Sequence, residues 1–137
     1  MRYQNFIERV QEVARLESRE EAARASVATL ETLGERISPR EREELAAQLT
    51  SELKEHLCAR HPNTLFPLEE FYDRVGARAD LHYRNAVERA LAVIAVLKEA
   101  VSPGEIEDIL AELPEEYGEL FGTRQPTSSS PTVSARR

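Results

Sequence analysis

Apolar residues recur along the chain at intervals of three and four positions, the spacing that places side chains on one face of an α-helix. Near the N-terminus, Phe6, Val10 and Val13 follow this spacing. A capping-box motif beginning at Ser18 then predicts a second helix from about Arg19 to Arg36. The pattern predicts an all-α protein.

The motif Ser-Pro-x-Glu occurs twice, at residues 38–41 and 102–105. Proline suits the first position of a helix, because its φ is already helical and its missing amide hydrogen would be unpaired there. The serine and the glutamate are expected to cap reciprocally, each side chain binding the other residue's backbone amide. We therefore expect helices to begin at Pro39 and Pro103.

The chain reads as two copies of one helical unit. Residues 3–10, YQNFIERV, resemble residues 68–75, LEEFYDRV, at a spacing of 65, and residues 37–57 resemble residues 101–121 at a spacing of 64. We predict an all-α fold in which a tandem duplication of a three-to-four-helix unit packs as one pseudo-symmetric helical bundle. The last helix of each copy is short and ends near Leu57 or Phe121.

One domain is expected over residues 1–121, with repeats at 3–57 and 68–121 and a linker at 58–67. Residues 122–137 lack apolar periodicity and are rich in serine, threonine and proline. Such a segment cannot offset the entropy of ordering by burial, so we predict a disordered C-terminal tail.

Composition narrows the possible functions. The formal net charge of −7 opposes binding to a phosphate backbone, so nucleic acid is not an expected partner. The longest apolar-leaning run is far shorter than the roughly 20 residues that cross a bilayer, and no membrane association is expected. One cysteine and no recognisable leader sequence predict a cytoplasmic protein.

The stretch HLCARHPN holds the single cysteine, Cys58, between His56 and His61. Zinc sites commonly take four ligands as two separated pairs, whereas these three residues lie on adjacent turns, and His82 or a carboxylate would have to supply the fourth ligand. A nucleophilic cysteine would also need a base from elsewhere. We interpret the stretch as a solvated helix end with a half-buried thiol, and predict no metal or cofactor.

Two further sets of charged residues recur in both copies. The carboxylates Glu41, Glu43, Glu105 and Glu107 could bind a divalent ion or act in acid-base chemistry, but acidic residues in a first helical turn are also what the helix dipole favours, and we prefer that interpretation.

The arginines Arg9 and Arg74 occupy matched places and could contact an anion or a partner. The alternative, which we prefer, is that each pairs with a nearby glutamate and packs its stem over the core.

The segments NFIERV, SREEAARA, FPLEEFYDRV and LPEEYGELF resemble a bacterial family known as Domain of Unknown Function 2267. The resemblance extends over nearly all of residues 1–121. It implies a small bacterial, cytoplasmic, all-helical protein. The activity of the family is unassigned, so the resemblance supplies no catalytic residues.

These observations favour a non-enzymatic protein-interaction or scaffolding module, because the repeated residues are capping and core positions and no catalytic motif is present. An alternative is binding of a small ligand or metal ion in a groove between the repeats. Nucleic-acid binding, through helix pairs that resemble helix-turn-helix units, is a weaker third hypothesis.

Overall fold

The computed structural model describes residues 1–123, so residues 124–137 of the predicted tail lie outside the described part. The described chain is helical and contains no strand, as the sequence predicted. Its elements are α1 (Tyr3–Ala14), α2 (Arg19–Arg36), α3 (Pro39–Ala46), α4 (Ser51–Leu57), α5 (Leu68–Ala79), α6 (Tyr83–Ala100), α7 (Pro103–Glu112) and the 3₁₀-helix η1 (Glu115–Gly118).

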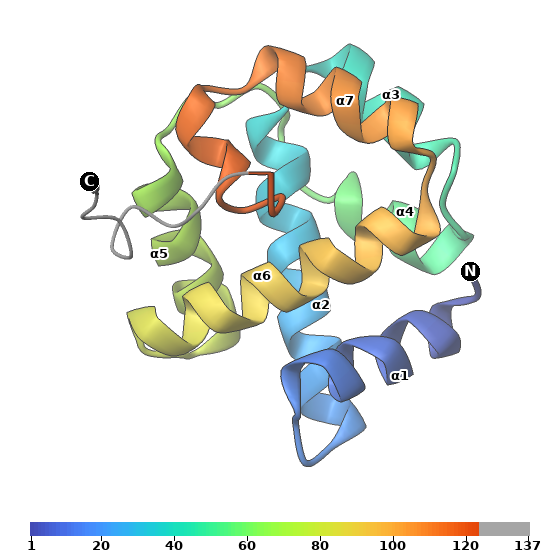
Figure 1. Cartoon of the computed structure of the whole chain (residues 1–137), viewed down its shortest axis with the longest axis vertical. Helices are drawn as coiled ribbons and strands as arrows, with labels where there is room; N and C mark the ends of the chain where they lie inside the picture. The colour runs from blue at the N-terminus through green and yellow to red at the C-terminus, as the bar shows by residue number, and fades with distance from the viewer. Residues whose placement is uncertain (124–137) are drawn as a thin grey trace, which may run out of the picture.

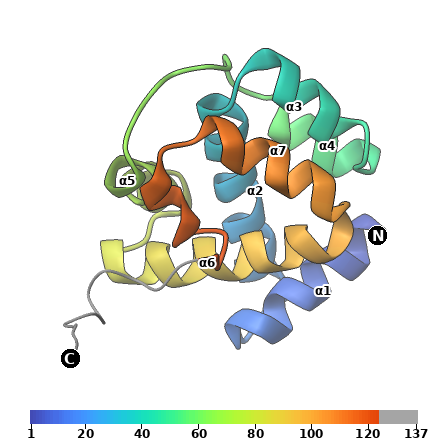
Figure 2. The ribbon, with the colours of Figure 1, turned by 45° about the horizontal axis from the view of Figure 1, so that its top comes forward.

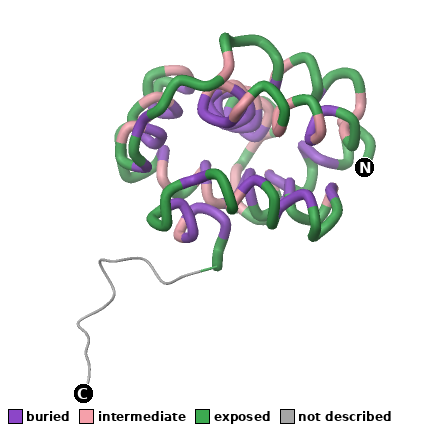
Figure 3. The backbone as a smooth tube through the Cα atoms, turned by 90° about the horizontal axis from the view of Figure 1, so that it is seen from above, coloured by how far each residue is buried: buried purple, intermediate pink, exposed green. Residues whose placement is uncertain are grey.

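The two longest helices, α2 and α6, pack against each other in the middle of the fold (Figure 1). Helix α1 packs against both α2 and α6, and so does α5. The short helices α3 and α7 lie together across one end of the molecule, as Figures 1 and 2 show. Buried positions concentrate where the helices face one another, while the outer turns are exposed (Figure 3).

Helix starts follow the predicted caps. The Ser18 hydroxyl accepts a hydrogen bond from the Glu21 amide at 3.1 Å, and α2 covers the predicted range. Helices α3 and α7 begin at Pro39 and Pro103, as predicted, and in each the preceding serine caps the first turn. These boundaries were predictable because capping depends on residues close together in sequence.

One core prediction was wrong. Phe6 and Val10 are fully buried, but the Val13 side chain, expected on the same face, is 37% exposed. Val13 lies in the last turn of α1, where it lines a surface groove together with residues of α6 and is not covered by the neighbouring helices.

The final helix of the second half, predicted to end near Phe121, is instead the 3₁₀-helix η1, which ends at Gly118. In the first half, Gly34 of α2 lets α4 approach so closely that a Cβ at this position would lie 1.8 Å from the Leu57 carbonyl oxygen. The residue equivalent to Gly34 is Lys98, whose ammonium group donates to the Phe121 carbonyl at 2.6 Å. A lysine at this position prevents the same close approach.

Candidate functional site

Two reciprocal contacts hold α3 beside α7 in antiparallel orientation. At the start of α3, the amide and the hydroxyl of Ser38 both donate to the Glu112 carboxylate at 2.7 Å. At the start of α7, the Ser102 amide donates to Gln48 Oε1 at 2.8 Å, and the Gln48 side-chain amide donates to the Ser102 hydroxyl at 3.2 Å. The start of each helix is thus bound to the end of the other.

These contacts change the role of the two Ser-Pro-x-Glu motifs. Each serine hydroxyl accepts from the amide of its glutamate, Glu41 or Glu105, at 3.2 Å, as predicted. The second hydrogen bond of a capping box runs from the serine amide to the glutamate carboxylate. It is not made here, because each serine amide donates instead to a side chain of the other half of the chain. Reciprocal capping by these glutamates was therefore wrongly predicted.

The freed carboxylates turn toward each other and form an acidic cluster between α3 and α7. Each residue is one helical turn from its partner on the same helix, so both lie on one face. One carboxylate oxygen from each of the four side chains lies within 4.8 Å of the other three; the residues are Glu41, Glu44, Glu105 and Asp108.

Two buried oxygens of the acidic cluster have no hydrogen-bond partner. Glu105 is only 4% exposed, and its Oε2 atom is buried without a hydrogen-bond partner. Glu41 Oε1 is also buried and unpartnered. At the edge, Arg40 forms an ion pair with Glu44 at 3.3 Å. A buried carboxylate without a donor is costly, so this arrangement favours any positive species that reaches it.

Burial and charge repulsion both act on the acidic cluster. Burial, the charges of Glu41, Glu44 and Asp108, and a hydrogen bond between the Glu41 and Glu105 carboxyl groups raise the pKa of Glu105 to about 7. Burial and neighbouring carboxylates also raise the pKa of Glu41 above its ordinary value. The cluster thus favours the uptake of either a proton or a metal ion at neutral pH.

Sequence reasoning found only half of the acidic cluster. Glu43 and Glu107, singled out with Glu41 and Glu105, are exposed and lie outside it. Glu44 and Asp108 were missed. The signal that could have found them is the repetition of an acidic residue three positions after Glu41 and three positions after Glu105, since this spacing puts both side chains on one helical face.

The cysteine and histidine stretch lies at the end of α4, as predicted, but the Cys58 thiol is exposed, so the prediction of a half-buried thiol was wrong. His56 is half-buried in the last turn of α4, whereas Cys58 and His61 are exposed. Among residues 1–123, the potential metal donors that gather within 4.8 Å are the carboxylates of the acidic cluster, and none of these three residues is among them.

Arg9 and Arg74 each pair with acids. Arg74 forms an ion pair with Glu35 of α2 at 2.9 Å and with Glu70 of its own helix, and its guanidinium lies 4.0 Å from the centre of the Phe66 ring. Arg9 binds Glu99 of α6 at 3.0 Å.

The sequence profile of an uncharacterised conserved protein family, DUF2267, matches residues 3–120. The chain belongs to the DUF2267 family. No curated protein matches it. Within the described part of this DUF2267 chain, no helix combines the length and apolar character needed to cross a membrane.

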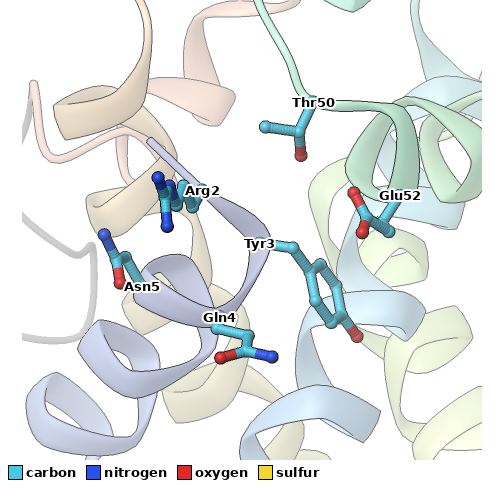
Figure 4. A pocket seen from close by; sticks show the side chains of 6 residues that line it. All are labelled: Arg2, Tyr3, Gln4, Asn5, Thr50 and Glu52. Carbon is cyan, nitrogen blue, oxygen red and sulfur yellow. The ribbon is translucent and has the colours of Figure 1, made fainter.

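A surface hollow of about 350 Å³ lies where the start of α1 meets the start of α4 (Figure 4). Its lining residues are Arg2, Tyr3, Gln4, Asn5, Thr50 and Glu52. Figure 4 shows that these side chains do not converge, since the Tyr3 ring and the Gln4 amide extend away from Thr50. The hollow offers no assembled set of polar groups for a ligand.

Two other surface grooves of the DUF2267 chain are lined by positions that correspond in the predicted repeat. One, of about 370 Å³, lies between α1 and α6, and the other, of about 450 Å³, lies between α5 and α2. Five positions of the first groove are separated by 64 or 65 residues, the spacing of the predicted repeat, from a position that lines the second. The pairs are Val13 and Arg78, Glu88 and Arg24, Leu91 and Val27, Ala92 and Ala28, and Ala95 and Glu31.

Proposed function

We propose that this DUF2267 chain is a non-catalytic interaction module, built as two like helical halves, that binds a partner protein in the groove between α1 and α6. The observation that carries the proposal is the equivalent lining of the two grooves. A duplicated unit provides two copies of any surface it had, and each copy is then free to acquire its own binding properties.

Reciprocal polar contacts support the duplication on which this proposal depends. Arg9 and Arg74 are equivalent positions, and so are their partners Glu99 and Glu35, which lie 64 residues apart. In both ion pairs, an arginine from the first helix of one half reaches a glutamate near the end of the second helix of the other half. Such pairs, like the crossed serine caps, are expected of two halves related by a pseudo-two-fold axis.

The two grooves differ in chemistry. In the α5/α2 groove, Arg60 forms an ion pair with Glu31 at 3.0 Å. In the α1/α6 groove, the position of Glu31 is taken by Ala95, which is exposed, and Val13 stands where the other groove has an arginine. The α1/α6 groove therefore presents an open apolar floor.

The occupant we propose is a short amphipathic helix of another protein, with its apolar face in the groove. Arg15 and Arg89 line the groove beside a single acid, Glu88, so its edge carries an excess positive charge. Acidic side chains flanking the apolar face of the partner helix would complement this edge. The positive charge is local to the groove, since the DUF2267 chain as a whole is acidic.

The test uses Ala95→Glu, which gives the α1/α6 groove the side chain that the other groove carries at its equivalent position. The full chain is crosslinked in a lysate of its source organism, and the crosslinked peptides are identified by mass spectrometry. Wild-type protein should capture a segment of amphipathic, acidic character, and Ala95→Glu should lose it. Ala77→Glu, an exposed change on α5 outside both grooves, should retain it.

Two outcomes would overturn the proposal. One is a strict monomer that retains no protein. The other is equal capture by wild type, Ala95→Glu and Ala77→Glu, which would place the contact elsewhere. The wild-type protein could instead capture a second copy of the same chain, with the capture lost only in Ala95→Glu. That result would show that the groove serves self-association and does not bind a different protein.

The alternative function is binding of a small ligand or metal ion between the halves. It is favoured by a specific observation, the unpaired carboxylates of the acidic cluster, and not by Arg9, Arg74 or the cysteine and histidine stretch. Nucleic-acid binding has less support, because the net charge of −7 repels a phosphate backbone. A mobility-shift assay at low salt tests it directly.

A further inference from the structure

Of the four side chains of the acidic cluster, Glu105 is buried, Glu41 and Glu44 are half-buried and Asp108 is exposed. Acidic residues in a first helical turn ordinarily bind the cap amide, but Glu112 and Gln48 have taken both amides. Glu105, at 4% exposure, consequently keeps its buried Oε2 without a donor, and one oxygen of its carboxylate lies within 4.8 Å of an oxygen of each of the other three acids. A buried acceptor of this kind calls for a partner, which is either a proton on the carboxyl group or a bound cation.

We propose that the acidic cluster binds one hard divalent cation of the size of Ca²⁺, which fastens α3 of the first half to α7 of the second. The proposal is independent of the partner groove, since it uses other residues at another end of the fold.

The donor set selects the class of ion. All four groups are carboxylates, and oxygen-only sites suit Ca²⁺, Mg²⁺ and Mn²⁺, whereas zinc and copper sites favour nitrogen and sulfur. Oxygens bound to one Ca²⁺ lie about 2.4 Å from it, so opposite ligands are separated by about 4.8 Å. The four carboxylate oxygens already lie within 4.8 Å of one another. Water completes the coordination, because Ca²⁺ takes six to eight oxygens.

The charges favour a divalent ion. The cluster gathers four carboxylates, and the Arg40 side chain, itself largely exposed, pairs with only one of them. A cation would replace mutual repulsion by attraction at the point where the halves meet. Because two ligands come from each half, binding should stabilise the association of α3 with α7 and hence the whole fold.

The proposal is tested on the full chain after removal of metal with EDTA. Calcium chloride is titrated by isothermal calorimetry, with Mg²⁺ and Mn²⁺ as parallel arms, and thermal unfolding is recorded with and without each ion. We expect one ion per chain and a rise in Tm of about 5 °C at saturating Ca²⁺. Glu105→Gln, which keeps the shape of the side chain, should abolish both signals.

The control variants are Glu107→Gln and Glu43→Gln. They remove the same charge from the same helices at exposed positions outside the acidic cluster, and should bind the ion as wild type does. Asp108→Asn changes an exposed ligand, so it should fold normally and weaken binding at least tenfold. Sodium chloride at matched ionic strength should leave Tm unchanged.

Three results would overturn the proposal. The first is the absence of binding heat with all three ions. The second is an equal Tm rise in wild type, Glu105→Gln and Glu107→Gln, which would indicate general charge screening. The third is a Glu105→Gln protein that gains stability while the ions leave the wild type unaffected, which would mean that the acids share a proton.

Discussion

Ser38 at the start of α3 binds Glu112 at the end of α7 through both its amide and its hydroxyl, each at 2.7 Å. The contact joins the two halves of the chain, and its equivalent between Ser102 and Gln48 joins them in the opposite sense. Because the serine amides are occupied, Glu41 and Glu105 cannot complete their capping boxes. The acidic cluster is thus a consequence of how the halves are held together.

Glu112→Ala removes the carboxylate that binds Ser38. We expect a loss of about 1 kcal/mol in the free energy of unfolding, because two exposed hydrogen bonds are replaced by bonds to water. Urea denaturation measures it. Glu115→Ala, at an exposed position in η1, is the control and should be neutral. Equal stability of the Glu112→Ala and wild-type proteins would show that the crossed caps do not stabilise the fold.

Gly34→Ala tests the close approach of α4 to α2. The added Cβ would lie 1.8 Å from the Leu57 carbonyl oxygen, so α4 must move, and we expect a loss of about 3 kcal/mol or more. Gly104→Ala is the matched control, because nothing lies within 4 Å of its Cβ position and alanine favours the helix. Thermal unfolding should show a large decrease in Tm for the first variant and none for the second.

The two equivalent arginines should differ in their effect on stability. Arg74 is 26% exposed, stacks on Phe66 and binds the well-buried Glu35, whereas Arg9 is 42% exposed and pairs on the surface. Arg74→Met should lower Tm by several degrees, because it leaves Glu35 with one partner fewer. Arg9→Met should change Tm by no more than about 1 °C. Equal shifts would contradict this.

Glu35 should give stability a dependence on pH. Burial alone would raise its pKa, but hydrogen bonds and charges from Arg74 and Arg78 outweigh burial and hold the pKa below the ordinary 4.5. The Glu35 carboxylate therefore takes up a proton more readily in the unfolded chain. Its contribution to the free energy of unfolding is present above pH 4.5 and is lost as pH falls through the folded-state pKa.

Glu35→Gln should accordingly be less stable than wild type at about pH 7, and the difference should shrink toward about pH 3.5. Urea denaturation at both pH values measures it. A difference of the same size at both would show that Glu35 acts through packing and not through its charge.

What the sequence could predict depended on the range of the interactions. Helix starts at Arg19, Pro39 and Pro103 follow from caps within four residues, and the structure has them at these positions. The environment of Glu105 could not be predicted in this way, because it depends on Gln48, which belongs to the other half of the chain. Val13 was misplaced for the same reason, since its exposure depends on how α6 packs beside the end of α1.

The candidate site shows the same limit. Glu41 and Glu105 were noticed, and the helix dipole was a sufficient local explanation for them. Only the antiparallel placement of α3 and α7 reveals that their carboxylates meet, with Glu44 and Asp108 beside them. The repetition of acids at the same two positions in both halves is visible in the sequence, but its meaning depends on the pairing of the helices.

The most direct test of the central claim, that the junction of the two halves holds a divalent ion, is anomalous diffraction from crystals soaked in manganese chloride. Mn²⁺ is a hard cation with an anomalous signal and stands in for Ca²⁺. We predict one peak between α3 and α7, about 2.2 Å from a carboxylate oxygen of Glu105. The absence of a peak there would contradict the account.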